Sequence, residues 1–372
     1  MSERPVLLAA GGTGGHLFPA ESLAIALAQR GLPVELVTDD RAARYGGAFP
    51  ARAIHTIASA TPRGGSIIAK GIAALTLLRG TLSAVALLRR VQPICVVGFG
   101  GYPTVPPLLA AALLRIPSIL HDQNAVLGKA NRFLASSVDA IGSGFPTLSG
   151  VSQSLRSRVT CTGNPVRPMV IEASQMPYPD FTDGLFRLLV TGGSQGAKVM
   201  SDIVPAAIAL LDPSQRARLV IVQQARGEDE ARVREAYAGL GVFAEVAPFF
   251  ADLPARIAQA HLVIARSGAS TVSELAVIGR PSILVPFPFA LDQDQAANAQ
   301  HLAASGAASV IVQKGFTPQW LAGQLAHALV DQPGLIQRAQ AARSAGAPDA
   351  AERLADLVID IIQRARKPET AA

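Results

Sequence analysis

The fold of this chain is decided by the stretch Leu7-Leu8-Ala9-Ala10-Gly11-Gly12-Thr13-Gly14-Gly15-His16. An apolar strand runs directly into a glycine-rich turn, and a helix-like segment from Pro19 to Gln29 follows. Glycine carries no Cβ, so such a turn lets the backbone approach a ligand closely. The free N–H groups at the start of the following helix favour an anion, usually a phosphate. The stretch therefore predicts either an anion site beside a candidate base, His16, or only a tight turn.

Composition indicates a folded two-domain protein with an anionic partner. The chain has 372 residues, of which 49% are apolar and 16% charged, so it can bury two cores and is not expected to be disordered. The net charge of +6 favours a nucleic acid, a phosphorylated substrate or an acidic membrane surface. Aromatic residues make up only 5% and do not alternate with basic ones, so we expect no nucleic-acid partner.

Cysteine usage and hydropathy predict a reducing compartment and no membrane span. Cys95 and Cys161 lie in apolar, strand-like runs, without a CxxC pattern or a disulfide framework. The first residues lack the layout of a signal peptide. No run of about 18 uncharged apolar residues predicts a transmembrane helix.

Strand-like and helix-like stretches alternate along both halves of the chain. Most strand-like stretches are continuous apolar runs, as in a parallel sheet covered on both faces, so we expect doubly wound α/β sheets. The expected strands are Val6–Ala10, Val34–Thr38, Ile94–Gly98, Ser118–His121, Ala140–Gly142, Val159–Gly163, Phe186–Val190, Leu219–Gln223, Val242–Val246, Leu262–Ala265, Ser282–Val285 and Ser309–Val312. The expected helices are Ala20–Arg30, Ile67–Arg90, Pro107–Leu114, Gly128–Ala135, Lys198–Leu211, Asp229–Leu240, Ala251–Ala260, Thr271–Ile278, Gln295–Ala304, Pro318–Leu329 and Ala350–Arg366.

A second glycine-rich turn, Gly192–Gly196, also follows a strand and precedes a helix. This internal repeat predicts two Rossmann-like domains facing a central cleft. We expect a first domain over residues 1–164 and a second over 165–349, with a polar linker stretch that reaches Gly184. The amphipathic helix at about 350–372 is expected to pack back on the first domain.

Glycine and polar clusters follow several strands, at the end of an open α/β sheet where ligands bind. They read GGTGGH at Gly11–His16, GFGGY at Gly98–Tyr102, HDQN at His121–Asn124, GNPVR at Gly163–Arg167, GGSQGA at Gly192–Ala197, RSGASTVSE at Arg266–Glu274 and DQDQAANA from Asp292. In this order they resemble the MurG family of bacterial glycosyltransferases, over nearly the whole chain. The resemblance implies a GT-B fold and an inverting transfer of GlcNAc from UDP-GlcNAc to the MurNAc 4-hydroxyl of lipid I. Lipid I is undecaprenyl-pyrophosphoryl-MurNAc-pentapeptide, and the implied product is lipid II, made at the cytoplasmic face of the bacterial inner membrane.

The resemblance also implies which residues bind UDP-GlcNAc. Glu274 resembles the ribose ligand, Ser194 a diphosphate contact, and Asn124 and Gln295 contacts to the donor sugar; Arg167 can form charge-assisted bonds to phosphate. The implied set is Thr13, Gly14, Gly15, Asn124, Arg167, Ser194, Phe250, Ala269, Ser270, Thr271, Val272, Ser273, Glu274 and Gln295. Ser270 stands where the family commonly has a larger apolar residue. Without the family, Ser194 is equally well explained as an N-cap, and helix capping is an alternative for Glu274. For a single Arg, Asn or Gln, such as Arg167, Asn124 or Gln295, a turn or surface residue is the commoner explanation.

The implied reaction requires the acceptor hydroxyl to lose a proton, and His16 is the candidate base. The alternatives for His16 are capping of the helix or binding of the acceptor diphosphate. Asp122, beside His121, is a second candidate base, although the family more often has Glu at this position.

The segment Asp292-Gln293-Asp294 has the D-x-D pattern with which many sugar-nucleotide transferases hold Mg²⁺ or Mn²⁺. Acidic residues are also favoured at a helix start without any metal. The family that this chain resembles stabilises the departing UDP with helix dipoles and polar groups. We therefore expect that no metal and no other cofactor is required.

The segment Ser66–Arg90 carries isoleucine and leucine on more than one helical face, with basic residues among them. Given a lipid-linked acceptor, we expect partial insertion at an anionic membrane surface through Ile68, Lys70, Ile72, Leu75, Leu78, Arg79 and Leu82. The alternative is a helix buried between the sheet and its neighbours. The expected partners are UDP-GlcNAc, lipid I, the membrane and proteins of cell-wall synthesis or division.

Other functions also fit these patterns. One is a GT-B transferase with a glycolipid or natural-product acceptor, another is a UDP-GlcNAc epimerase, and a third is a module that binds a UDP-sugar without catalysis. The HDQN and GNPVR segments favour the cell-wall transferase, since they resemble that family specifically. Release of UDP in the presence of a lipid I analogue distinguishes the transferase from the binding module.

Overall fold

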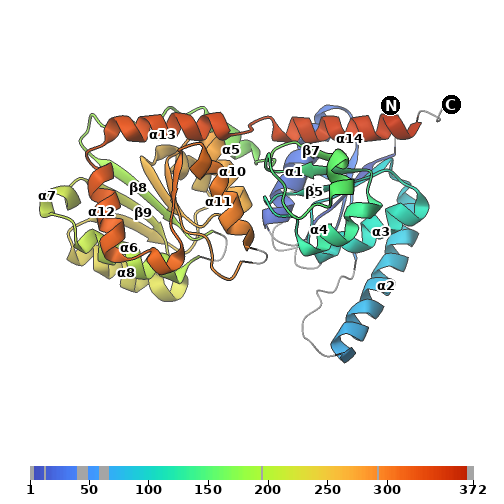
Figure 1. The fold of residues 1–372 in the computed structure, drawn as a ribbon, viewed down its shortest axis with the longest axis horizontal. Coiled ribbons are helices and arrows are strands. Elements are labelled where there is room, and N and C mark those ends of the chain that lie inside the picture. Colours follow the sequence, from blue (N-terminus) through green and yellow to red (C-terminus); the bar gives the residue numbers. More distant parts are fainter. Residues whose placement is uncertain are drawn as a thin grey trace. The chain divides into compact units, whose positions relative to one another are not determined.

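The chain forms two compact units, Met1–Arg167 with Pro348–Ala372, and Pro168–Ala347. The computed structural model describes residues 4–11, 14–39, 49–57, 67–193, 196–290 and 293–366, and only the backbone of residues 67–74. Each unit is a parallel sheet with helices on its faces (Figure 1).

The first unit is a seven-stranded parallel sheet in the order β3-β2-β1-β4-β5-β6-β7. Adjacent residues of β1 face opposite sides: Val6 and Leu8 join one buried cluster with α1 and α14, and Leu7 and Ala9 join another with α2 and α3. The sheet is therefore covered on both faces, as its continuous apolar strands require. The strands are β1 Val6–Ala9, β2 Val34–Thr38, β3 Ile54–Thr56, β4 Cys95–Gly98, β5 Ser118–Asp122, β6 Ala140–Ser143 and β7 Val159–Cys161.

The helices of the first unit include one from the far end of the chain. Leu354 and Val358 of α14 are fully buried in the cluster that also holds α1 and the sheet. Arg30 of α1 pairs with Asp356 of α14 at 2.9 Å. The helices are α1 Gly14–Gln29, α2 Ile67–Val91, α3 Val105–Leu114, α4 Lys129–Leu134 and α14 Ala350–Arg366, with short 3-10 turns η2 Tyr102–Thr104, η3 Ala135–Ser137 and η4 Gln153–Arg158.

The second unit is a six-stranded parallel sheet in the order β10-β9-β8-β11-β12-β13. Its strands are β8 Phe186–Thr191, β9 Leu219–Gln224, β10 Phe243–Ala247, β11 Leu262–Ala265, β12 Ser282–Leu284 and β13 Ala308–Val310. Its helices are α5 Pro168–Ser174, α6 Lys198–Ala209, α7 Pro213–Arg216, α8 Gly227–Gly239, α9 Leu253–Gln259, α10 Ala269–Ile278, α11 Asp294–Ala304, α12 Pro318–Ala328 and α13 Gln332–Ala345, with η6 Gln313–Gly315.

In several places the structure differs from the sequence-based expectation. Helix α1 begins at Gly14 rather than near Pro19, so His16 is its third residue and not part of the turn. The stretch expected as a linker to Gly184 forms α5, and Tyr178 and Phe181 pack on the second unit's core. Strand β3 and helix α13 were not expected; β3 is a three-residue edge strand with exposed residues, which lacks an apolar signal.

Candidate functional site

Three neighbouring strands of the first unit bring together three of the glycine and polar clusters that the sequence contains. Strands β1, β4 and β5 are adjacent in the sheet and parallel, so the segments after their carboxyl ends meet at one edge. His16 follows β1, Gly100 and Gly101 follow β4, and Gln123 follows β5.

The imidazole of His16 lies against the glycine turn after β4. Gly100 and Gly101 have φ values of +87° and +75°, which favour glycine. A Cβ on Gly100 would lie 3.4 Å from Cε1 of His16, and one on Gly101 would lie 3.4 Å from Nε2. The two glycines therefore leave the half-buried ring room at its Nε2 side.

A row of hydrogen bonds leads from His16 into the sheet. The Nδ1 atom of His16 lies 2.9 Å from Oε1 of Gln123, and Nε2 of Gln123 lies 3.1 Å from both Nδ1 and the backbone oxygen of His121. The Nε2 atom of His121 lies 3.1 Å from the oxygen of Gly163. Burial of His121 lowers its pKa to about 4, so its ring is neutral near pH 7.

Asp122 is placed as an anchor for the loop after β5. Its oxygens accept hydrogen bonds from the N–H of Asn124 at 3.0 Å, the N–H of Gly128 at 2.8 Å and Nδ2 of Asn131 at 2.8 Å. Burial raises the pKa of the Asp122 carboxyl, and these hydrogen bonds offset part of the shift. With three donors on a carboxylate that is 2% exposed, the geometry favours positioning of Asn124 over a role as base.

Gly14 and Arg167 are linked through Phe18. A Cβ on Gly14 would lie 2.8 Å from the Phe18 ring, so glycine there makes space for the ring. The Arg167 guanidinium lies 4.1 Å from the centre of that ring. Burial raises the pKa of Glu21, and the nearby charge of Arg167 acts in the opposite direction. Gly15, next to Gly14, is exposed at the start of α1.

In the second unit, the glycine turn after β8 is held by Gln224. Oε1 of Gln224 accepts from the hydroxyl of Thr191 at 2.9 Å and from the N–H of Gly192 at 3.1 Å. A Cβ on Gly192 would lie 2.2 Å from the nitrogen of Ala197, so the turn closes only with glycine there. Gln224 was not among the predicted residues, because one buried amide at a strand end carries no motif.

The start of α10 presents open N–H groups. Its N-cap, Gly268, supplies no side-chain hydrogen bond, and a Cβ there would meet no atom within 4 Å. The first N–H groups of the helix therefore lack a partner from within it. Val272 and Glu274 are buried on this helix, whereas Ser270, Thr271 and Ser273 are half-buried.

Hydrogen bonds connect the start of α10 to Gln295. The hydroxyl of Ser267 donates to the backbone oxygen of Gln295 at 2.8 Å, and Nδ2 of Asn298 donates to the oxygen of Ser267 at 3.2 Å. The side-chain Oε1 of Gln295 accepts the N–H of Phe287 at 3.0 Å. The nitrogen end of the Gln295 amide is therefore the end that can donate to a ligand.

Arg266 and Phe250 are buried side chains that precede α10 in the sequence, and each makes contacts within the second unit. Arg266 donates to the oxygens of Val285 and Pro286 at 3.0 and 3.1 Å, and burial lowers its pKa. It therefore braces the segment after β12. Phe250 is 7% exposed, and the Arg256 guanidinium lies 4.3 Å from its ring centre.

The comparisons with known proteins agree over both units. The model of the glycosyltransferase family 28 N-terminal domain matches residues 6–143, and that of the C-terminal domain matches 187–354. A Methylobacterium nodulans protein is 57% identical over 95% of this chain and 96% of its own. It is named UDP-N-acetylglucosamine--N-acetylmuramyl-(pentapeptide) pyrophosphoryl-undecaprenol N-acetylglucosamine transferase. A protein of that name from Rhodopseudomonas palustris is 54% identical over 97% of this chain and 99% of its own. The crystal structure of Acinetobacter baumannii MurG has 30% identity and a TM-score of 0.77, covering 96% of this chain and 99% of that one.

The chain belongs to the MurG family of glycosyltransferases. The GT-B fold expected from the sequence is confirmed, since both family 28 domains match and the MurG structure superposes over nearly the whole chain. A UDP-GlcNAc 2-epimerase from Neisseria meningitidis, with 13% identity and a TM-score of 0.64 over 97% of this chain and all of that one, shares the fold alone.

Several residues implied by the MurG resemblance lie outside the described residues. These are Thr13, Ser194 and Asp292, together with the side chains of Ile68, Lys70 and Ile72. Within the described ranges, no group of three or more His, Cys, Asp or Glu side chains could hold a metal ion.

The helix expected at the membrane exposes its leucines. Leu75, Leu78 and Leu82 of α2 are 50%, 56% and 61% exposed, and Arg79 is exposed among them. Burial of this part of α2 between the sheet and its neighbours, the alternative interpretation, is therefore wrong for these leucines. In the part of the chain that the structure covers, no helix is both long and apolar enough to span a bilayer.

The neighbouring helices add residues that the sequence analysis did not name. Leu113 at the end of α3 is 70% exposed and Phe133 of α4 is 61% exposed. Helix α3 packs against both α2 and α4, and Lys129 and Arg132 of α4 are also exposed. No helical periodicity identifies single exposed apolar residues of this kind before the fold is known.

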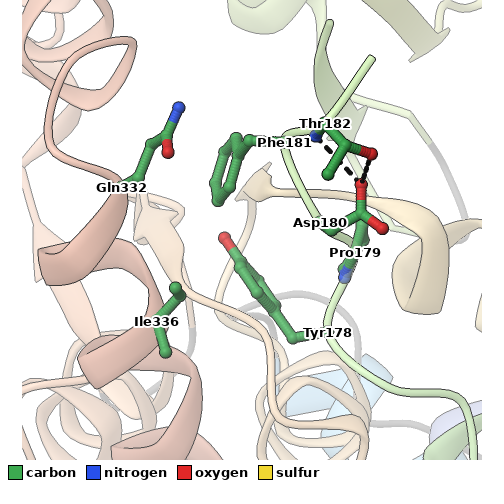
Figure 2. Close-up of a pocket in the computed structure, with 7 residues that line it drawn as sticks. All are labelled: Tyr178, Pro179, Asp180, Phe181, Thr182, Gln332 and Ile336. Carbon is green, nitrogen blue, oxygen red and sulfur yellow. Dashed lines mark hydrogen bonds between the residues drawn. The ribbon is translucent and has the colours of Figure 1, made fainter. Parts of the chain in front are cut away.

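The second unit also contains a groove. It runs between the segment Tyr178–Thr182 and α13, which contributes Gln332 and Ile336 (Figure 2). None of the residues that the MurG family implies for UDP-GlcNAc lines this groove.

Proposed function

We propose that this protein transfers GlcNAc from UDP-GlcNAc to the 4-hydroxyl of MurNAc in lipid I, with inversion, forming lipid II and UDP. The observation that carries the proposal is the 54–58% identity, over at least 95% of the chain, to relatives named for this transfer. A glycosyltransferase fold with both family 28 domains supports the reaction class.

The second unit supplies the donor site in this proposal. The open N–H groups at Ala269, Ser270 and Thr271 favour a diphosphate, because the helix start is electropositive. Glu274, buried in the next turn, accepts hydrogen bonds from the ribose diol. Gln295 donates its amide to the GlcNAc moiety. Ser194, Val272, Ser273 and Phe250 complete the pocket for the nucleotide.

The first unit supplies the acceptor side and the base. Nε2 of His16 takes the proton of the acceptor 4-hydroxyl, whose oxygen forms a bond to the anomeric carbon as the bond from that carbon to the diphosphate oxygen breaks. UDP leaves with the electron pair of the broken bond. Thr13, Gly14 and Gly15 lie beside this residue in the sequence and bind phosphate or sugar oxygens, with Asn124 and Arg167.

The reaction is tested by UDP release with a lipid I analogue. We expect release that depends on the acceptor, and a kcat lower by about 10²- to 10⁴-fold in His16→Ala, the range that a general base contributes. Asp122→Asn keeps one acceptor oxygen for the loop and is expected to lose less activity. Binding of UDP without turnover would contradict the proposal.

We propose that no metal or cofactor takes part. The helix start and neutral polar groups then carry the negative charge of the departing UDP. Activity in EDTA is expected to equal activity in buffer with Mg²⁺. Loss of activity in EDTA that Mn²⁺ restores would assign a metal role to the acidic pair Asp292 and Asp294.

We propose that the protein binds peripherally to the cytoplasmic face of the inner membrane, where it meets lipid I and proteins of cell-wall synthesis or division. The exposed leucines of α2, with Arg79 among them, suit an anionic surface. Replacement of Leu75, Leu78 and Leu82 with Ser is expected to weaken binding to phosphatidylglycerol-containing vesicles at least about tenfold, because apolar burial in the membrane is lost.

A matched control places the same number of substitutions elsewhere. Leu210, Phe243 and Val330 of the second unit are 54%, 72% and 70% exposed. Their replacement with Ser is expected to leave vesicle binding unchanged. Equal binding of both triple variants would contradict the role of α2.

A further inference from the structure

The row of hydrogen bonds beneath His16 ends on two backbone carbonyl oxygens. These belong to His121 and Gly163, and each lies 3.1 Å from a side-chain nitrogen, of Gln123 and His121 respectively. A carbonyl oxygen can only accept a hydrogen bond. The two oxygens therefore determine which atom donates and which accepts in every hydrogen bond of the row.

The first carbonyl orients the amide of Gln123. Because the oxygen of His121 accepts, the amide end that faces it at 3.1 Å is the NH₂ group. The other end, Oε1, then faces Nδ1 of His16 at 2.9 Å. An amide oxygen has no hydrogen to give, so Nδ1 of His16 carries the proton that joins them.

The second carbonyl independently gives the same orientation of the Gln123 amide. Because the oxygen of Gly163 accepts, Nε2 of His121 carries its proton. The buried ring is neutral near pH 7, so its Nδ1 has a lone pair and accepts the second N–H of Gln123 at 3.1 Å. A charged His121 would instead turn an N–H toward the NH₂ group of Gln123.

We propose that His121 and Gln123 are positioning residues that hold His16 in the Nδ1–H tautomer and leave Nε2 unprotonated. Nε2 is the atom on the side of Gly101, where the missing side chain leaves space. This assignment rests on the proposed function only for its catalytic consequence, since the tautomer itself is set by the hydrogen bonds. It gives the HDQN segment a role through His16.

The tautomer is measured directly on the full chain. Protein labelled with ¹⁵N-histidine gives separate signals for protonated and unprotonated ring nitrogens, and those of His16 are assigned by their loss in His16→Gln. Near pH 7.5 we expect the proton of the neutral His16 ring on Nδ1. A proton on Nε2 in the wild-type protein overturns the proposal, whatever the variants do.

Two substitutions of Gln123 distinguish the hydrogen bond that its side chain accepts from His16 from the packing of that side chain. Gln123→Met keeps the length of the side chain without an acceptor oxygen, so His16 is expected to shift towards the Nε2–H form. The kcat then falls about 10- to 100-fold, part of the contribution of a general base, while KM for UDP-GlcNAc stays within about twofold. Gln123→Glu keeps an acceptor oxygen and is expected to retain the Nδ1–H form. An unchanged tautomer in Gln123→Met overturns the positioning role.

Thr162→Val is the matched control. The Thr162 hydroxyl donates to the same Gly163 oxygen at 3.0 Å but takes no part in the row. This variant is expected to keep the wild-type spectrum of His16. A tautomer shift in Gln123→Met with unchanged kcat supports the positioning role and refutes His16 as the base, so the two proposals fail separately.

Discussion

At the scale of single residues, the buried ring of His121 links stability of the first unit to pH. Its pKa is about 4 in the folded protein against 6.5 for an ordinary histidine. Between these values the unfolded chain binds a proton that the folded protein does not. The contribution to stability is therefore complete above pH 6.5 and is lost as the pH falls through 4, by about 3 kcal/mol in total.

The comparison with His121→Gln isolates this effect, because the variant has no titrating group at the site. Between about pH 7 and pH 5, we expect the unfolding free energy of the wild-type protein to fall by about 2 kcal/mol more than that of the variant. Urea unfolding followed by circular dichroism measures both. Equal losses would mean that His121 titrates normally in the folded state.

His16 and Gln123 show what the sequence could and could not predict at this scale. Both lie in segments that the sequence analysis singled out, because glycine turns and polar clusters after strands are visible in one dimension. Their contact joins residues 107 positions apart and depends on which strands are neighbours in the sheet. Periodicity contains no strand order, so the role of Gln123 was not predicted.

At the scale of elements, the uncapped start of helix α10 is expected to lower the stability of the protein slightly and to favour ligand binding. Gly268, its N-cap, leaves the first N–H groups open. In Gly268→Asp a carboxylate caps these groups, which adds at most a few tenths of a kcal/mol to stability. The carboxylate also occupies the position expected for a diphosphate, and its negative charge repels that anion. We expect the Kd for UDP, measured by calorimetry, to rise at least about tenfold while Tm does not fall.

The control for this substitution is another helix start in the same unit. Thr317, the N-cap of α12, accepts a hydrogen bond from the N–H of Trp320 at 3.2 Å. Thr317→Asp introduces the same charge at a helix that is already capped. Its UDP affinity is expected to stay at the wild-type value, and a loss equal to that of Gly268→Asp would point to a general charge effect.

The elements that the sequence predicted are those with a strong apolar signal. Strands such as β1 and β11 are fully buried on both faces, so their apolar runs are continuous. Helix α5 was mistaken for part of a linker, because Pro168 and the polar residues around it resemble a boundary. The start of α1 was placed too late, since Pro19 inside the helix is a residue usually found at a first turn.

At the scale of the whole molecule, the first unit is built from both ends of the chain. Helix α14 begins after the entire second unit, yet Leu354 and Val358 are fully buried beside α1 and the sheet. The second unit has its own buried cluster, whose members run from Phe186 to Leu335 and include no residue of the first unit. A destabilising substitution in α14 should therefore lower the stability of the first unit and leave that of the second unchanged.

Leu354→Ala tests this division, because a buried Leu→Ala change costs about 2–5 kcal/mol through lost burial and the cavity that remains. Hydrogen–deuterium exchange is expected to increase across the sheet and α1 of the first unit, whereas residues 168–347 exchange as before and UDP binds with unchanged Kd. Glu352→Ala, an exposed truncation on the same helix, should change neither readout. If the Kd for UDP rose while the first unit lost stability, the two cores would unfold as one. The assignment of α14 to an independent core of the first unit would then be wrong.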